Sequence, residues 1–308
     1  MPEHLINLDD WSRAEIEECF RRAGDLKARH ARGEVVAIMA GKTLACIFHK
    51  PSLRTRVSFE AGMHQLGGDA IYLTDAEVGL GKREAVADVA RVLASMVDGI
   101  MIRTFAHAPV EALARHSRVP VINGLTDFSH PCQILADLFT LHERGADLDR
   151  LRIAWIGDGN NVCQSWMEAA TRFPFHLAIA TPKAYAPPAE QVARLKPLAK
   201  GGIELTHDPQ AAARGADVRY TDVWASMGQE AEQEKRRRDF AGFRIDAELL
   251  ALAAPGAVVM HCLPAHRGEE ITEDVLEGER SIVFPQAENR LHLQKGILAM
   301  LMERSPSR

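Results

Sequence analysis

Two kinds of hydrophobic pattern alternate from one end of the chain to the other. Short runs of apolar, often β-branched residues, such as Thr43 to Phe48, are separated by longer runs in which apolar residues recur every three or four positions. The short runs are typical of buried strands and the longer runs of amphipathic helices. Regular alternation of the two indicates parallel strands joined by crossover helices. The pattern therefore predicts an α/β fold built on doubly wound parallel sheets.

The two halves of the chain repeat this scheme, which predicts two domains. The predicted strands are 43–48, 70–73, 99–102 and 119–122 in the first half, and 151–156, 176–180, 217–221, 257–261 and 281–284 in the second. The predicted helices are 12–31, 56–66, 83–96, 109–116, 131–144, 161–172, 189–200 and 289–303. A polar stretch around Gly145 separates the halves, so we expect domains of residues 1–144 and 145–288. The charged stretch 230–239 is predicted to be a solvated, mobile face.

The composition excludes several classes of protein. Of the 308 residues, 46% are apolar and 26% are charged, as in ordinary globular proteins. The net charge of −5 gives no general attraction for nucleic acid or an anionic membrane, so we expect neither as a partner. The most apolar stretch, 249–260, is broken by Pro255 and Gly256 and is too short for a membrane helix. The N-terminus has no basic stretch followed by an apolar run, as a secretion signal would. We expect a soluble, cytoplasmic protein.

The cysteines fit the same compartment. Five of them stand at positions 19, 46, 132, 163 and 262, and no two form a C-x-x-C pair. This pattern is typical of reduced thiols that mostly serve as small core residues. We expect neither a disulfide framework nor a structural metal site.

Candidate chemistry in the first half lies just after the predicted strands, where open parallel sheets bind ligands. Residues Ser52 to Arg56 bring hydroxyls and two arginines to a helix start, which suits a phosphate, although a plain Ser N-cap with surface arginines has the same sequence. Arg103 follows the third strand. His130 and Gln133 open the next helix and could hold a carbonyl oxygen and an amide, or simply cap that helix.

The second half offers polar groups at the corresponding places. Gly157-x-Gly159 opens a helix, but Val162 occupies the third glycine position, so the dinucleotide fingerprint is incomplete. Asn161 could bind a small zwitterion, and Asp222, followed by a small flexible loop, could bind an amine beneath a lid or form a plain turn. Cys262 could be a nucleophile, a metal ligand or a contact group, and nothing in the sequence favours covalent chemistry.

Together these residues fall into two groups. The first half offers an anion and carbonyl site, to which Arg290 at the start of the last helix adds a candidate anion ligand. The second half offers a site for an amine or an amino acid. The combination predicts group transfer from a phosphorylated donor to an amine, across a cleft between the domains.

Four motifs in this order resemble those of the carbamoyltransferases. They are Ser52-x-Arg54-Thr55-Arg56, His130-Pro131-Cys132-Gln133, Asp222-Val223-Trp224-x-Ser226-Met227-Gly228 and His261-Cys262-Leu263-Pro264. The last two specifically resemble ornithine carbamoyltransferases. The resemblance extends from about Leu8 to Met302.

The resemblance implies a fold, an assembly and a reaction. The fold would have two α/β domains, with the C-terminal helix 289–308 packing back on the first. The assembly would be a homotrimer or a multiple of trimers with active sites at subunit interfaces. Carbamoyl phosphate and L-ornithine would give L-citrulline and phosphate, with no metal and no organic cofactor.

The resemblance also implies roles for individual residues. The carbamoyl-phosphate ligands would be Ser52, Leu53, Arg54, Thr55, Gly79, Arg103, His130, Gln133, Cys262, Leu263 and Arg290. Ornithine would contact Asn161, Asp222, Ser226 and Met227. Catalytic roles would fall to Arg54, Arg103, His130 and Cys262. The sequence departs from the family pattern at Leu53, where Thr is usual, and at Gly79, where Gln is frequent.

Other readings of the sequence stay open. The acceptor could be an acylated ornithine, putrescine or aspartate, although Asp222 and its loop favour a free amino acid with a basic side chain. A paralogue that binds these ligands without turnover would have the same fold. A nucleotide-dependent oxidoreductase would rest on Gly157-x-Gly159 alone.

Overall fold

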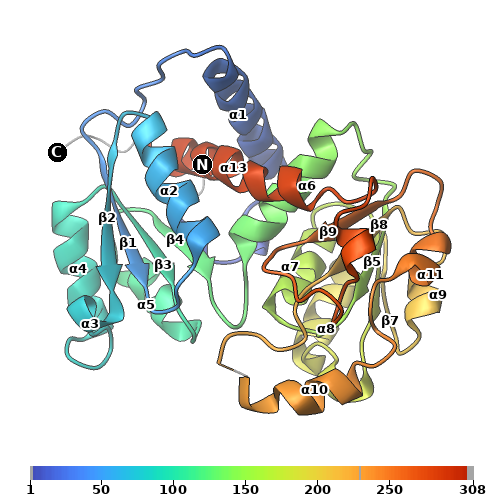
Figure 1. Ribbon diagram of the computed structural model, residues 1–308. Helices are drawn as coiled ribbons and strands as arrows, with labels where there is room; N and C mark the ends of the chain where they lie inside the picture. The colour runs from blue at the N-terminus through green and yellow to red at the C-terminus, as the bar shows by residue number, and fades with distance from the viewer. Residues whose placement is uncertain (1–2, 229, 304–308) are drawn as a thin grey trace. The chain divides into compact units, whose positions relative to one another are not determined.

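The computed structural model describes residues 3–228 and 230–303 and divides into two compact units (Figure 1). The first unit contains the residues up to Phe139 and those from Glu288 onward, and the second contains Thr140–Ala287. The division lies within helix α6 (Pro131–Glu143), whose end we took as the domain boundary from the sequence. No helix of the described residues is both long and apolar enough to cross a membrane.

The first unit is built on a four-stranded parallel sheet with strand order β2-β1-β3-β4. Its strands are β1 (Thr43–Phe48), β2 (Asp69–Thr74), β3 (Gly99–Arg103) and β4 (Val121–Leu125). Its helices are α1 (Arg13–Ala31), α2 (Leu53–Gln65), α3 (Asp75–Val78), α4 (Val86–Met96), α5 (Ala108–His116), most of α6, and α13 (Val283–Met302) from Glu288 onward, with a 3₁₀ turn at Leu8–Asp10.

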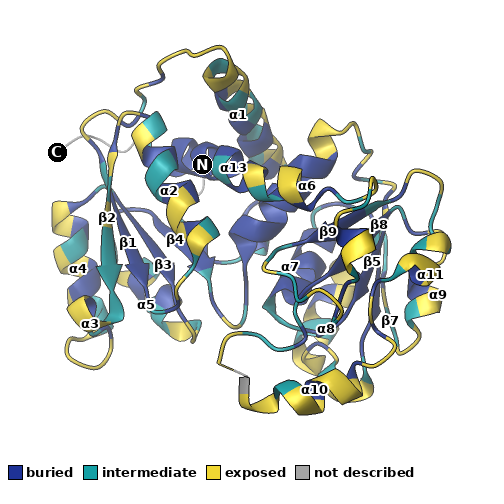
Figure 2. Cartoon of the chain, in the orientation of Figure 1, coloured by how far each residue is buried: buried dark blue, intermediate teal, exposed yellow. Residues whose placement is uncertain are grey.

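Helices cover both faces of this sheet. Ala45 and Ile47 of β1 pack with the apolar faces of α4 and α5 in one buried cluster, which also includes Val89 and Val110. On the opposite face the sheet is covered by α2 and α13, where a Cβ on Gly99 would lie 2.8 Å from the sulfur of Met302. Figure 2 shows β1, β3 and β4 as buried, whereas the edge strand β2 is intermediate to exposed.

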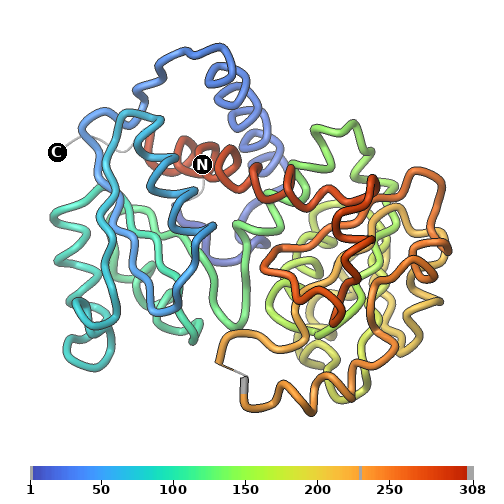
Figure 3. Tube along the Cα trace, viewed as in Figure 1, coloured from blue at the N-terminus to red at the C-terminus, as the bar shows by residue number. Residues whose placement is uncertain are grey.

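The last helix, α13, runs beside α1 in the Cα trace (Figure 3). Polar contacts join the two helices at both ends of the part of α13 that belongs to this unit. Lys27 Nζ of α1 donates a hydrogen bond to Asn289 Oδ1 at 2.8 Å, and Arg22 pairs with Glu303 at 2.5 Å. Between them, Lys295 Nζ donates to Gln65 Oε1 at 2.9 Å. These contacts hold the part of α13 from Asn289 onward, and therefore Arg290, against α1 and α2.

The second unit is built on a five-stranded parallel sheet with strand order β7-β6-β5-β8-β9. Its strands are β5 (Arg152–Ile156), β6 (His176–Ala180), β7 (Ile203–Thr206), β8 (Val218–Thr221) and β9 (Val258–His261). Its helices are α7 (Asn161–Ala170), α8 (Ala189–Leu195), α9 (Pro209–Ala213), α10 (Gln233–Asp239), α11 (Ala247–Ala251) and α12 (Glu273–Leu276), with 3₁₀ turns at Lys183–Tyr185, Lys196–Leu198 and Glu230–Glu232.

Two different cores hold this second sheet. On one face, Ala154 and Ile156 of β5 pack with α9, α11 and α12 through small and aliphatic side chains. On the other face, Trp155 and Tyr220 stack with ring centroids 5.3 Å apart, and Trp166 of α7 meets Tyr220 edge-on at 5.5 Å. The prediction of an α/β fold with two doubly wound parallel sheets is confirmed.

The strand order reverses once in each sheet, and this locates the place where ligands should bind. The reversal lies between β1 and β3 in the first sheet and between β5 and β8 in the second. In open α/β sheets, ligands bind at such switch points, beyond the carboxyl ends of the strands. Ser52 to Thr55, Arg103, Asn161 and Asp222 lie at or just after these four strands, whereas His130 and Gln133 follow β4 and Cys262 follows β9.

Some predictions about elements were wrong or incomplete, and the short helices α3, α9, α11 and α12 were not predicted. Residues 281–284 are not a strand, because Ser281 forms only an isolated bridge and α13 already begins at Val283, with Pro285 tolerated in its first turn. The edge strand β7 was missed because it has only four residues. The charged stretch 230–239 is not simply a solvated face, since it contains α10 and the buried Arg236.

Candidate active site

The first helix after β1 begins with a capping serine and has no acidic side chain in its first turn. Ser52 Oγ accepts a hydrogen bond from the Thr55 backbone N–H at 3.2 Å, which makes Ser52 the N-cap of α2. The first turn contains no acidic side chain, so the positive end of the helix dipole is not neutralised there. The Leu53 side chain is 73% exposed. The backbone N–H of Leu53 is one of the first N–H groups of the helix, which have no partner within the helix and can donate to an anion.

Two arginines from other elements converge on Thr55. Its Oγ1 accepts from Arg103 Nη1 at 3.3 Å and from Arg290 Nη2 at 3.4 Å. Arg290 Nη1 also donates to Gln133 Oε1 at 2.6 Å, and Gln133 Nε2 donates to Asp137 Oδ1 at 2.9 Å. All of these side chains except that of Asp137 were candidates from the sequence, and the structure brings them together. Both arginines are buried, in contrast to the solvated position that is usual for Arg.

His130, at the start of α6, is surrounded by positive charge. Burial lowers the pKa of His130 well below its usual range, and the nearby guanidinium groups of Arg290, Arg103 and Arg54 lower it further. His130 is therefore an uncharged imidazole at neutral pH, able to donate one hydrogen bond to a carbonyl oxygen. Arg54 is the third arginine whose charge lowers the pKa of His130.

The uncharged state of His130 has a consequence for anion binding. We expect the dissociation constant for sulfate, whose charge is constant over this range, to change less than about threefold between about pH 5.5 and 8. A histidine with an ordinary pKa would become charged as the pH falls and would tighten sulfate binding. Isothermal titration calorimetry at several pH values measures this directly. Tenfold tighter binding below about pH 6.5 that disappears in His130→Gln would contradict a lowered pKa.

Gly79 lies apart from this cluster. It ends α3 in the left-handed conformation, with φ of +59°, and a Cβ there would lie 2.7 Å from the Cβ of Arg83. In the described part of the chain, the hydrogen bonds of this loop stay local: Lys82 Nζ reaches Asp75 Oδ2, and Arg83 Nη2 reaches the Glu77 carbonyl oxygen. The structure therefore does not place Gly79 with the arginines of its own unit.

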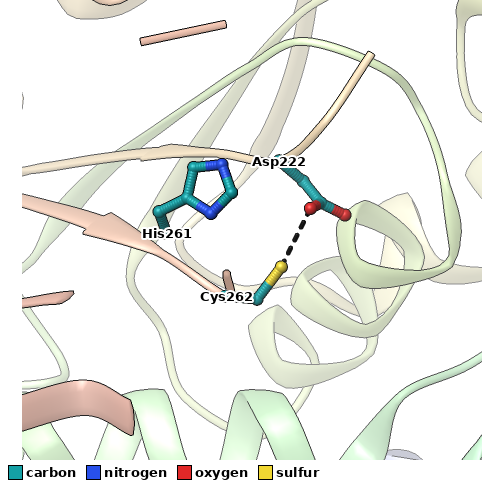
Figure 4. A group of neighbouring side chains, drawn as sticks. All are labelled: Asp222, His261 and Cys262. Carbon is teal, nitrogen blue, oxygen red and sulfur yellow. Dashed lines mark hydrogen bonds between the residues drawn. The ribbon is translucent and has the colours of Figure 1, made fainter. Parts of the chain in front are cut away.

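Asp222 is the centre of the candidate residues in the second unit. It follows β8, is buried, and accepts through Oδ2 from Asn160 Nδ2 at 2.8 Å. Its Oδ1 accepts from the Val223 backbone N–H at 2.8 Å and from the Cys262 thiol at 2.9 Å. Figure 4 shows the thiol pointing at this carboxylate. The structure thus brings Asp222 and Cys262 together, as expected for two neighbouring strand ends.

Asn160 contacts the candidate residue Asp222, and the sequence reasoning missed it. Its Oδ1 caps α7 by accepting from the backbone N–H groups of Val162 and Cys163. Its Nδ2 is then directed at Asp222. The preceding Gly159 has no room for a side chain, because a Cβ would overlap the backbone of Ala186 and Pro187. The Gly157-to-Asn161 turn was the available signal, but we read its second asparagine, Asn161, which begins α7.

Ser226 and Met227 lie in the segment 223–228 that follows Asp222, where the Met227 side chain is 43% exposed. A buried ion pair holds the start of this segment. Arg236 Nη1 of α10 donates to Asp158 Oδ2 at 2.8 Å and to the Trp224 carbonyl oxygen at 2.7 Å. Burial raises the pKa of Asp158 to about 6, although Arg236 acts in the opposite direction. Neither residue was a candidate from the sequence.

Asp222, His261 and Cys262 also have the composition of a metal site. One potential ligand atom from each lies within 4.8 Å of the others. Both ring nitrogens of His261, however, already have partners, namely the Leu263 backbone N–H and Glu270 Oε1. The Cys262 thiol donates its proton to Asp222. This hydrogen bonding accounts for the three residues without an ion.

Comparison with known proteins agrees with the two-unit division. Residues 3–143 match the model of the aspartate/ornithine carbamoyltransferase carbamoyl-P binding domain, and residues 149–301 match that of the Asp/Orn binding domain. The ornithine carbamoyltransferase of Syntrophus aciditrophicus is 52% identical over 98% of this chain and 100% of its own length. That of Thermococcus kodakarensis is 50% identical over 97% of this chain and 96% of its own.

Solved structures give the same result. The ornithine carbamoyltransferase from Pyrococcus furiosus has a TM-score of 0.95 and 47% identity, and the match covers 99% of this chain and 98% of that one. The anabolic enzyme from Campylobacter jejuni has a TM-score of 0.91 and 38% identity, covering 97% and 98%. By sequence and by structure, the chain belongs to the aspartate/ornithine carbamoyltransferase family.

Proposed function

We propose that this protein transfers the carbamoyl group of carbamoyl phosphate to the δ-amine of L-ornithine, giving L-citrulline and phosphate. It is a transferase of the ornithine carbamoyltransferase type, since relatives at about 50% identity over the whole chain carry that name. The observation that carries the proposal is the presence of two complementary sites on two matched domains. One is a buried cluster of arginines around a neutral histidine, and the other is a buried carboxylate beside a thiol.

The first unit would bind the donor. The phosphate would be held by Arg54, Arg103 and Arg290, together with the hydroxyls of Ser52 and Thr55 and the free N–H groups at Leu53 and the α2 terminus. His130 would donate to the carbamoyl oxygen. Gln133 has its oxygen on Arg290 and its amide on Asp137, so its main role would be to orient Arg290.

The second unit would bind the acceptor. The Asp222 carboxylate would pair with the α-ammonium group of ornithine. Asn160, Asn161, Ser226 and Met227, from the adjoining segments, would also contact the amino-acid end. Cys262 and Leu263, at the end of β9, would lie near the reacting δ-amine and the carbamoyl group. In this proposal Cys262 is a contact group that acts through hydrogen bonding, because its thiol proton is engaged with Asp222.

The chemistry explains why the donor site is so positive. A carbamoyl carbon is a poor electrophile because its nitrogen donates electrons into the carbonyl. The lone pair of the δ-nitrogen forms the new C–N bond, the carbonyl oxygen becomes an oxyanion, and the C–O bond to phosphate then breaks. Arginine and histidine donors stabilise the oxyanion and the departing phosphate, and each donor typically contributes about 3 kcal/mol to lowering the barrier.

The nucleophile must be the neutral amine, whereas a free alkylammonium group has a pKa of about 10. Ornithine therefore loses a proton before or during the attack. The ammonium group gives one proton to solvent before the attack. We propose that the departing phosphate takes the second proton, which leaves the nitrogen once the C–N bond has formed. Atoms and charge then balance without a dedicated base on the protein.

We also propose a homotrimer or a multiple of trimers. Three apolar side chains of α2 and the edge strand β2 are exposed in the single chain, namely Leu53, Val57 and Ile71. Their burial against a second copy would remove apolar surface from water. Sedimentation equilibrium should give a mass three times the 34.0 kDa of the chain, or a multiple of that value. A stable monomer at catalytic concentrations would contradict this assembly.

The compartment and the pathway follow from the same proposal. Five free cysteines, four of them buried, suit the reducing cytoplasm. Formation of citrulline from ornithine is a step of arginine biosynthesis or of arginine and ornithine metabolism. No nucleic-acid or membrane partner is proposed for this acidic chain.

A parallel assay for ureido products tests the proposal. The purified protein receives carbamoyl phosphate with L-ornithine, N-acetylornithine, putrescine or aspartate, and each acceptor is also tested without the donor. We expect citrulline from ornithine and at least about a hundredfold less product from the others. N-acetylornithine lacks the α-ammonium group that would pair with Asp222, putrescine lacks the α-carboxylate, and aspartate has no side-chain amine to attack the donor. Product only from another amine would overturn the acceptor assignment. Binding of carbamoyl phosphate without any product would show a non-catalytic paralogue.

A further inference from the structure

A buried acid–histidine pair lies directly behind the end of β9. His261 and Glu270 have side chains that are 0% exposed, and His261 Nε2 lies 3.1 Å from Glu270 Oε1. The same Oε1 accepts from the His266 backbone N–H at 2.6 Å. Neither His261 nor Glu270 has a role in the donor or acceptor contacts proposed above. A carboxylate is almost never fully buried unless it is paired or hydrogen-bonded, so the contact between Glu270 and His261 accounts for its burial.

The hydrogen bonds define which nitrogen of His261 carries the proton. The Leu263 backbone N–H donates to His261 Nδ1 at 2.8 Å, so Nδ1 must be an acceptor. The single proton of the neutral ring then lies on Nε2 and is donated to Glu270. Glu270 therefore selects the tautomer that allows His261 to hold the backbone of Leu263.

The Leu263 backbone needs such support. Leu263 has a φ of +56°, and it is the one non-glycine residue with a positive φ in the described part of the chain. This left-handed conformation is unfavourable for a bulky side chain, so the surrounding structure must impose it. The turn places the Cys262 thiol on Asp222. Its other side is fixed by Gln286, whose Oε1 accepts from the His261 backbone N–H and whose Nε2 donates to the Tyr220 hydroxyl.

We propose that Glu270 and His261 are positioning residues for the acceptor half of the reaction. Glu270 holds the proton of His261 on Nε2, His261 Nδ1 holds the Leu263 N–H, and the resulting turn presents Cys262 and Leu263 to the reacting groups. The inference rests on the proposed function, which it deepens. It differs from a purely structural role because it predicts a defect in the use of ornithine and not in the binding of the donor.

Two substitutions at Glu270 separate these roles. Glu270→Leu removes both acceptor oxygens, whereas Glu270→Gln keeps one oxygen that can accept from His261 and His266. We expect Glu270→Leu to lower kcat/KM for ornithine by about a hundredfold, as displacement of a reacting group by about 1 Å does. We expect Glu270→Gln to stay within about fivefold of the parent protein. Carbamoyl-phosphate affinity, measured by calorimetry without ornithine, should change by less than about fivefold in both, because the arginines proposed to hold the phosphate belong to the first unit.

Glu269→Gln is the matched control. Glu269 is the neighbouring acid, pairs with Arg237 at the surface, and has no hydrogen bond to His261 among the described contacts. We expect its kinetics to be those of the parent protein. Circular dichroism melting of every variant separates a loss of folding from a loss of positioning.

If Glu270→Leu does not fold, a pair of substitutions at His261 decides the question. His261→Asn keeps an acceptor near the position of Nδ1 and loses the contact with Glu270. His261→Gln keeps a donor near Nε2 and loses the acceptor for Leu263. We expect the variant His261→Asn to retain at least about tenfold more activity with ornithine than the variant His261→Gln. The reverse order would overturn the proposal.

A second readout does not depend on the reaction. Cys262 is the one cysteine of the five that is not fully buried, so iodoacetamide should label it first. We expect Glu270→Leu, or His261→Gln in its place, to change the labelling rate at least about fivefold, while Glu269→Gln does not. Unchanged labelling and unchanged ornithine kinetics in the folded variants would overturn the positioning role. Absence of citrulline formation by the parent protein would instead overturn the proposed function, and labelling would still report on the turn.

Discussion

Replacing Arg54 by alanine is expected to lower kcat for citrulline formation about a thousandfold and to leave the melting temperature nearly unchanged. Arg54 stands in the first turn of α2, and its charge contributes to the lowered pKa of His130. It would therefore lie where the phosphate and the oxyanion develop negative charge. Its partial exposure means that the folded chain can lose the side chain without leaving a large cavity. Initial rates at saturating substrate, followed by a thermal melt, give both quantities.

Two further variants show whether charge or geometry is responsible. Arg54→Lys keeps the charge but cannot form two parallel hydrogen bonds with a phosphate, so we expect it to recover only a small part of the lost activity. Arg91→Ala removes an exposed arginine of α4 that pairs only with a neighbouring surface acid, Asp88, in the described contacts, and should be silent. Near-normal citrulline formation by Arg54→Ala would remove Arg54 from the donor site.

The position of Arg54 illustrates what the sequence could predict. Hydrophobic periodicity located the strands, and the rule for open parallel sheets directed attention to the residues that follow them. This rule singled out Ser52, Arg103, Asp222 and Cys262, because each lies at the end of a strand or within four residues of it. At these positions the local hydrophobic pattern gives the end of the strand, and the sheet geometry gives the reason to expect a ligand there.

Residues whose importance depends on distant partners could not be predicted in the same way. Arg236 and Glu270 stand in polar stretches, where charged side chains are solvated by default. Their burial depends on Asp158, 78 positions from Arg236, and on His261. The start of α13 was misplaced for a related reason. Residues 281–284 favour a strand by composition. The helix nevertheless begins at Val283, whose side chain packs in the buried cluster of the second unit.

Asp222→Asn is the second substitution with a large expected effect. We expect kcat/KM for ornithine to fall about a thousandfold, which corresponds to about 4 kcal/mol. The carboxylate receives hydrogen bonds from three donors: Asn160, the Val223 N–H and Cys262. An amide of the same shape has one acceptor oxygen, so its NH₂ group must face a donor. It also lacks the negative charge that would pair with the ammonium group of ornithine.

The donor site provides the internal control for this variant. Carbamoyl-phosphate affinity, measured calorimetrically without ornithine, should stay within about twofold of the parent value, because Asp222 belongs to the other unit. Asp239→Asn is the matched surface variant, since this carboxylate bonds Lys235 and Tyr185 on an exposed face and should leave the kinetics unchanged. Equal loss of donor and acceptor binding in Asp222→Asn would indicate a general disturbance of folding.

The division of the effect between kcat and KM then tells how Asp222 acts. A rise in KM with kcat unchanged would mean that the carboxylate binds ornithine equally in the ground state and in the transition state. We expect kcat to fall as well, because Asp222 also holds the Cys262 thiol at 2.9 Å and so links ammonium recognition to the turn near the reacting amine. In Cys262→Ala the thiol is gone while the carboxylate remains, so kcat should fall with a much smaller change in KM. If Cys262→Ala instead matched Asp222→Asn in both constants, the carboxylate would act only through the thiol and would not bind the ammonium group.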